Sequence, residues 1–180
     1  QNPALLGSYD TPGEAKYVTV SNNIAYVADE WAGLQIIDVS NPENPVLLCS
    51  YNTPGEAISV TVSNNIAYIA YVAVYYTGLQ IIDVSNPYSP VFLNSIFLHT
   101  TSIIKKCIIY NNLLIITDNN WNELSFYDVN NPASPEFVCR YSWNLTTVDM
   151  VIEDGYLYTA NENYGLNILD LNQVMEAEDS

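Results

Sequence analysis

An internal repeat constrains the fold of this chain more than any other feature of its sequence. The segment Val18–Tyr26 recurs without change as Val60–Tyr68, and Gly33–Pro42 recurs without change as Gly78–Pro87. Looser copies of both segments follow twice in the second half of the chain. The four repeats lie at approximately 3–44, 45–89, 90–134 and 135–171. Because they fill the chain, we expect one domain over residues 1–180.

Each repeat is predicted to contain four short strands. Its segments are rich in Val, Ile and Tyr and are bounded by Gly, Pro and Asn, which favours strands over helices. The pair Asn22–Asn23 predicts a tight hairpin, because Asn tolerates the left-handed backbone of such turns. The only helical pattern is in the acidic tail, residues 172–180. In the first repeat the expected strands are Leu5–Asp10, Lys16–Ser21, Ile24–Asp29 and Leu34–Ser40.

Four strands per repeat and a period of roughly 40–45 residues are typical of a propeller blade. The fold class is therefore predicted as all-β, a β-propeller of four four-stranded blades. The run Gly33–Pro42, preceded by Ile24–Asp29, also resembles the LVIVD repeat of bacterial and archaeal surface proteins. This resemblance implies a β-propeller in a secreted or cell-surface protein. It implies no catalytic residues, because the family motif is structural.

The strand order predicts how the propeller closes. Leu5–Asp10 aligns with segments that form the outermost strand of a blade, such as Leu47–Asn52, yet it has no blade before it. The last blade stops at Leu166–Leu171 and lacks an outer strand. We expect the N-terminal strand to supply it within the chain, which removes an exposed sheet edge. The alternative is strand addition to a neighbouring molecule, which would build a dimer, a ring or a filament.

Composition excludes several classes of function. The formal charge is −16, with only 4 Lys and Arg against 20 Asp and Glu. Four cations cannot form a basic footprint, so binding to nucleic acid or to an anionic membrane surface is not expected. No apolar run approaches the roughly 18 residues of a membrane helix, so no membrane insertion is expected. The first residues lack the pattern of a signal peptide, as in a processed secreted protein.

An aromatic loop face is the first candidate site. Every repeat places an aromatic residue in the loop before its third strand, and all these loops share one end of the blades. Such rings, accompanied by carboxylates, suit sugar faces, cationic groups or another protein. The alternative is that the rings pack between blades. The candidate binding residues are Trp31, Tyr75, Tyr76, Trp121 and Tyr164.

A recurring aspartate is the second candidate. Four carboxylates with ring symmetry could hold Ca²⁺ through hard oxygen ligands. The alternative is that each carboxylate accepts hydrogen bonds from the turn that follows it. No other cofactor is expected. The four positions are Asp38, Asp83, Asp128 and Asp170.

Enzymatic activity is not expected. His99 is the only histidine, and it lies in a degenerate part of the third repeat, so a nucleophile and base pair has little support. Cys49, Cys107 and Cys139 are an odd number with wide spacing, which does not suggest a disulfide framework. A glycosylation triplet at Asn144 is compatible with secretion.

Two functions remain open at this point. The first is a non-enzymatic, extracellular structural protein of the cell surface, self-associating by strand exchange of Leu5–Asp10 or through the aromatic face. The second is an adhesion module that binds a glycan or a surface protein on that face. The sequence identifies no ligand for either.

Overall fold

The computed structural model describes residues 2–73, 76–98, 101–142 and 146–176. Blade 1 contains β1 (Tyr17–Ser21), β2 (Ile24–Ala28), β3 (Leu34–Asp38) and β4 (Val46–Tyr51). Blade 2 contains β5 (Glu56–Ser63), β6 (Ile66–Val72), β7 (Thr77–Asp83) and β8 (Val91–Phe97). Blade 3 contains β9 (Cys107–Tyr110), β10 (Leu113–Asp118), β11 (Glu123–Asp128) and β12 (Glu136–Ser142). Blade 4 contains β13 (Thr147–Glu153), β14 (Tyr156–Asn161) and β15 (Gly165–Asp170), followed by the short helix α1 (Asn172–Glu176).

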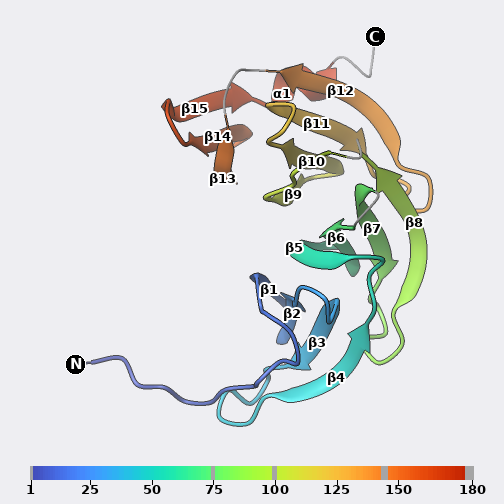
Figure 1. Cartoon of the computed structure of the whole chain (residues 1–180), viewed down its shortest axis with the longest axis vertical. Helices are drawn as coiled ribbons and strands as arrows, with labels where there is room; N and C mark the ends of the chain where they lie inside the picture. Colours follow the sequence, from blue (N-terminus) through green and yellow to red (C-terminus); the bar gives the residue numbers. More distant parts are fainter. Residues whose placement is uncertain (1, 74–75, 99–100, 143–145, 177–180) are drawn as a thin grey trace.

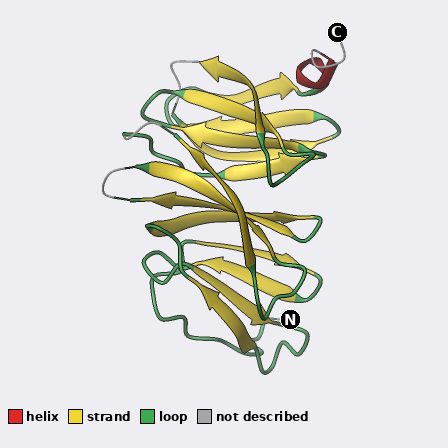
Figure 2. Cartoon of the chain, turned by 90° about the vertical axis from the view of Figure 1, so that its right-hand side faces the viewer, coloured by secondary structure: helices red, strands yellow, loops and turns green. Residues whose placement is uncertain are grey.

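The four blades follow one another around an arc, with the first strand of each blade nearest the centre (Figure 1). Each sheet is antiparallel and takes its strands in chain order. Strands that follow one another in the sequence, as in β1–β4 and β5–β8, are therefore hydrogen-bonded neighbours in the sheet. Figure 2 shows the same sheets from the side, one above the other. The predicted all-β propeller architecture is confirmed.

The repeated Asn pairs form the tight hairpins between the first two strands of a blade. Asn22 and Asn23 have φ angles of 51° and 61°, and Asn64 and Asn65 have the same values. Blade 4 replaces the pair with Asp154 and Gly155, which also have positive φ. Two consecutive left-handed residues match the twist of the flanking strands and fix their register.

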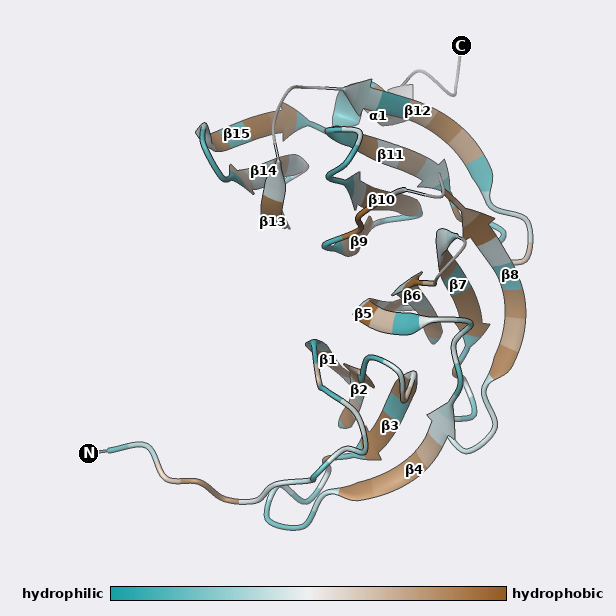
Figure 3. Cartoon of the chain, in the orientation of Figure 1, coloured by the Kyte–Doolittle hydropathy of each residue, from teal (hydrophilic) through white to brown (hydrophobic). Residues whose placement is uncertain are grey.

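The three largest apolar cores lie between the blades, and a small fourth cluster, Ala25, Val27 and Ile37, lies on blade 1 alone. Between blades 1 and 2, Leu34 and Ile36 of β3 pack with Val60 of β5 and Ile69 of β6. The same positions of blade 2 pack against blade 3, and those of blade 3 against blade 4. Strand β10 is buried along its whole length, and apolar residues are concentrated in the strands, whereas most loops are hydrophilic (Figure 3). Each sheet is therefore apolar on both faces and needs a neighbour on each.

The end of the arc differs from the expectation in one respect. The last sheet has three strands, β13–β15, and residues 4–10 form no strand. The N-terminal segment therefore does not close the propeller within this chain. The backbone of Gly7 passes close to the carbonyl oxygens of Pro42 and Glu43, in the loop between β3 and β4. That position holds the segment beside blade 1, away from β15 (Figure 1).

The inter-blade cores predict where truncation is costly. Leu79→Ala removes a fully buried side chain between blades 2 and 3, and we expect it to lower the free energy of unfolding by about 2–5 kcal/mol. Val91→Ala is the control, because Val91 is an exposed apolar residue on β8 and its loss should cost less than about 0.5 kcal/mol. Urea unfolding measures both, and equal effects would contradict an inter-blade core.

Candidate functional site

Four of the five candidate aromatic residues lie in equivalent loops at one end of the blades. Trp31, Trp121 and Tyr164 are exposed and lie in equivalent loops, each between the second and third strands of its blade. Tyr76 is at the matching position of blade 2, where it packs edge-to-face with Tyr71 and Phe97 at centroid distances of 6.1 and 5.8 Å. The other predicted member, Tyr75, lies outside the described residues. The face thus combines exposed rings with one ring that packs on its own blade.

Several carboxylates near this face have partners within the chain. Asp29 is buried and accepts hydrogen bonds from the Thr11 hydroxyl and the Gly13 N–H. Asp118 is also buried and accepts a hydrogen bond from the Ser102 hydroxyl. Both carboxylates thereby fix the loop that leads into the first strand of their blade. They are positioned to stabilise that loop and not to meet a ligand.

The four recurring aspartates each close a local turn. Asp38 and Asp83 end their third strands and accept hydrogen bonds from N–H groups two residues later, both at 2.8 Å. Hydrogen bonds from the Ser40 side chain and backbone hold the pKa of Asp38 below its ordinary value. Asp128 and Asp170 make the same turn with Asn130 and Asn172.

The structure does not bring these four aspartates together. Within the described ranges, no three His, Cys, Asp or Glu side chains are grouped so as to hold a metal ion. The turns account for their recurrence, and calcium binding at these positions stays a prediction from the sequence alone. The glycosylation candidate Asn144 and the single histidine His99 lie outside the described residues.

Cys49, Cys107 and Cys139 are not joined in disulfides. Cys107 is fully buried on β9, and burial raises its thiol pKa to about 12. A thiol with that pKa is protonated at neutral pH and is a poor nucleophile. Cys49 and Cys139 are half-buried on the outer strands β4 and β12.

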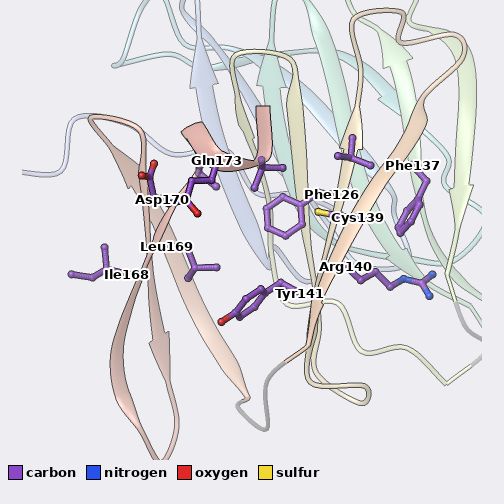
Figure 4. Close-up of a pocket in the computed structure, with 12 residues that line it drawn as sticks. Phe126, Phe137, Cys139, Arg140, Tyr141, Ile168, Leu169, Asp170 and Gln173 are labelled. Carbon is purple, nitrogen blue, oxygen red and sulfur yellow. The ribbon is translucent and has the colours of Figure 1, made fainter. Parts of the chain in front are cut away.

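A groove beside the last blade is a feature of the described surface that the sequence did not predict as a site. It has a volume of about 650 Å³ and lies between the outer strand β12 of blade 3, strand β15 and helix α1. In Figure 4 the Leu169 side chain points toward Phe126 and Tyr141, while Ile168 points the opposite way. The groove adjoins the β15 edge, where blades 1 to 3 carry a fourth strand.

The N-terminal segment has the sequence of a fourth strand. Residues 3–15 read Pro-Ala-Leu-Leu-Gly-Ser-Tyr-Asp-Thr-Pro-Gly-Glu-Ala, and residues 45–57 read Pro-Val-Leu-Leu-Cys-Ser-Tyr-Asn-Thr-Pro-Gly-Glu-Ala. The second of these segments contains β4. In this structure Leu5 and Leu6 are instead exposed, Leu5 at 87%. The chain thus has a three-stranded blade and an unpaired segment with the sequence of the missing strand.

Lys106 joins three blades at the centre, a role that the sequence did not predict. It precedes β9 of blade 3, forms an ion pair with Asp149 of blade 4 and lies 5.6 Å from the ring centroid of Tyr17 in blade 1. Burial lowers the pKa of Lys106, but the hydrogen bond that Lys106 donates to Asp149 and the nearby Tyr17 outweigh it, so the net pKa is raised. The same hydrogen bond holds the pKa of Asp149 below its ordinary value.

Comparisons with known proteins agree with the repeat analysis. The profile of the LVIVD repeat matches four segments, residues 12–53, 54–97, 107–142 and 146–172, which together make up most of the chain. No curated protein matches the chain. Within the described ranges, no helix has the length and apolar character needed to cross a membrane.

Solved structures with a similar fold differ in length. The computationally designed Ika4 protein superposes with a TM-score of 0.73 and 10% identity, over 95% of this chain and 99% of Ika4. A protein from Lactobacillus plantarum gives 0.74 and 13%, over 89% of this chain and 52% of its own. The periplasmic gluconolactonase of Pseudomonas aeruginosa gives 0.71 and 14%, over 86% and 49%. The chain spans about half the length of the last two proteins, and at these identities the similarity shows the fold alone.

The Lys106 contacts predict an acid-sensitive contribution to stability. Because Asp149 is largely exposed, we expect Lys106→Met to lower the free energy of unfolding at neutral pH by only about 0.5–1 kcal/mol. The pKa of Asp149 is lower in the folded state, so this contribution is present above the ordinary aspartate pKa. It is lost as the pH falls through the lowered value.

Thermal unfolding between pH 7 and pH 2 measures this effect, with Lys105→Met as the control at an exposed neighbouring lysine. The difference between Lys106→Met and the unmodified chain should shrink as the pH falls. A difference that stays constant over this range would contradict the assignment.

Proposed function

Because the chain belongs to the LVIVD repeat family, we propose that it is a non-enzymatic structural propeller of the cell surface, and that it self-associates by strand addition. Residues 4–10 of one copy add as the fourth strand of blade 4 in a second copy, next to β15. The observation that carries this proposal is the three-stranded last blade with an open groove beside it. An unpaired sheet edge is a template for an added strand.

The internal blades supply the expected register. In blade 1, Tyr51 pairs with Leu34, Ser50 with Gln35 and Leu47 with Ile37. The same alignment pairs Tyr9 with Leu166, Ser8 with Asn167 and Leu5 with Leu169. In blade 1 the Leu47 side chain packs on the sheet face turned away from blade 2. The corresponding face of blade 4 packs against blade 3, so Leu5 of the added strand is expected to enter the groove near Leu169.

A second copy fits this edge better than the same chain does. Within the chain, residues 4–10 lie beside blade 1, so reaching β15 would require blade 1 to move to blade 4. A second copy brings its own blade 1 and its own segment together. Its segment gains backbone hydrogen bonds and its two exposed leucines gain burial, each worth up to about 1.5–3 kcal/mol.

The cell-surface location and the absence of catalysis rest on other support. The repeats of this chain resemble the LVIVD repeats of secreted and surface proteins, and the residues of the repeat motif are structural. The conspicuous side chains of the chain are also occupied in ways that serve the fold: the recurring aspartates close turns, and the Cys107 thiol is buried. Western detection in cell-surface and cytosolic fractions, and a turnover screen, test these two parts directly.

Strand addition predicts an effect of charges in the N-terminal segment. We expect Leu5→Asp with Leu6→Asp to weaken self-association at least ~100-fold, because both side chains become half-buried in the complex, as Leu47 and Leu48 are in blade 1. Sedimentation velocity over a concentration series measures the association. The chain should unfold with an unchanged midpoint as a monomer, because both residues are exposed before association.

Tyr88→Asp is the matched control, since Tyr88 is exposed in the loop between β7 and β8. This loop belongs neither to residues 4–10 nor to blade 4, the two parts that the proposal joins. It should associate as the unmodified chain does. A chain that stays monomeric at high concentration, or a double variant that still associates, would overturn the proposal.

The exposed aromatic face supports a second candidate function, binding of a glycan or a surface protein. Trp31 and Tyr164 present exposed rings at one end of the blades, and flat rings stack on the apolar faces of sugars. We expect a glycan array to show binding that Trp31→Ala reduces about 10-fold. Tyr88→Ala is the control for loss of an exposed ring elsewhere. Binding that is indifferent to Trp31→Ala would reject this face.

A further inference from the structure

Blade 4 exposes one of its two sheet faces. On β15, Leu166 and Ile168 hold the positions that Leu34 and Ile36 hold on β3, as the pairing of each strand with its neighbour shows. Leu34 is 0% exposed, because blade 2 covers it, whereas Leu166 is 64% exposed. The pattern that receives the next blade is therefore present on blade 4 and uncovered.

Blade 1 exposes the innermost strand of the complementary face, whereas Ala25, Val27 and Ile37 on the same face are buried. Val18 and Val20 of β1 correspond to Val60 and Val62 of β5, because the repeat Val18–Tyr26 is identical to Val60–Tyr68. Val60 is 0% exposed against blade 1, whereas Val18 is 56% exposed. Blade 1 thus carries the residues by which blade 2 docks on its predecessor, and they too are uncovered.

The junction of blades 1 and 2 shows how the two patterns fit. Leu34 and Ile36 of the preceding blade pack with Val60 of the following blade. At the rim, Glu30 and Ala57 exchange two backbone hydrogen bonds, at 3.0 and 2.8 Å. The β4 strand of the preceding blade then leads through residues 52–55 into β5 of the following blade. Face packing and the fourth strand are therefore parts of one junction.

We propose that the exposed faces of blades 4 and 1 form this same junction between two copies of the chain. This inference rests on the strand addition proposed above. If residues 4–10 of a second copy pair with β15, the chain that follows them places its blade 1 on the exposed face of blade 4. Val18 and Val20 of that copy then cover Leu166 and Ile168, and Ala15 and Glu162 hold the positions of Ala57 and Glu30.

Two such junctions close a ring of two copies with eight blades. A two-fold axis makes the junctions identical, with blade 4 of each copy docked on blade 1 of the other. A closed pair of copies leaves no uncovered sheet face and no unpaired sheet edge. An open chain of copies would leave an uncovered face at each of its two ends.

The junction is tested by charges on its two faces. Val20→Glu alters only blade 1 and Leu166→Glu only blade 4, at side chains that are exposed in the single chain. Each variant should therefore fold normally and weaken the two-copy complex at least ~100-fold. Val91→Glu is the matched control, an exposed valine on the outer strand β8, and should leave association unchanged. Mass photometry and sedimentation velocity report the number of chains.

Mixing the variants tests the head-to-tail arrangement. A Val20→Glu copy keeps an intact blade 4, and a Leu166→Glu copy keeps an intact blade 1. One unaltered junction can therefore form between them, and the mixture should recover two-copy particles that neither variant forms alone. Small-angle scattering should find these particles more extended than the closed pair of the unmodified chain.

The possible results separate this inference from strand addition. One result would keep strand addition and overturn the packed junction: Leu5→Asp with Leu6→Asp abolishes association, whereas Val20→Glu and Leu166→Glu leave it intact. Mixtures that recover nothing, or an unmodified chain that grows beyond two copies, would overturn the closed ring. An unmodified chain that stays monomeric would overturn strand addition as well.

Discussion

The packing of one sheet face on the next is the interaction on which the rest of this structure depends. A four-stranded sheet of about 25 residues has no interior of its own, so its apolar side chains are buried only by its neighbours. The three largest buried clusters accordingly lie one at each junction, with Leu34 and Ile36 at the first and Leu79 and Ile81 at the second. The two ends of such an array are necessarily incomplete. Their exposed faces and the unpaired edge of β15 are consequences of the same requirement.

The sequence predicted the blades well because each blade is specified locally. The Asn22–Asn23 turn, the alternating strands and the verbatim repeats all indicate the same four-stranded unit, and the turn residues have the left-handed backbone that this requires. It also showed that residues 4–10 have the sequence of a fourth strand. The expectation that Leu5–Asp10 completes blade 4 within the chain was wrong, because this closure depends on whether blade 1 meets blade 4. No local pattern encodes the curvature of the arc.

The candidate sites show the same division. The exposed rings at Trp31 and Tyr164 followed from loop positions alone. The recurring aspartates were ambiguous because duplication repeats a turn-closing residue as faithfully as it would repeat a ligand, and the hydrogen bonds of Asp38 and Asp83 show the turn. Lys106 was missed because its partners, Asp149 and Tyr17, come from two other blades. In a repeat protein, residues that recur at the same position in every repeat reflect the shared fold. Residues whose contacts are found in one repeat alone reflect the role of that repeat.

The acidic charge of the chain fits an assembly that is built from apolar faces. A formal charge of −16 on each copy opposes association, yet the strand segments that form the proposed junction carry few charges. The side chains of Val18, Val20, Leu166 and Ile168 are uncharged, while many acids lie in the loops at the two ends of the blades. Repulsion between copies therefore acts at longer range and is screened by salt over about 8–10 Å, whereas face packing acts at contact. In the proposed assembly, the charge of each copy would raise the concentration that association requires at low salt, and the exposed faces would determine the geometry.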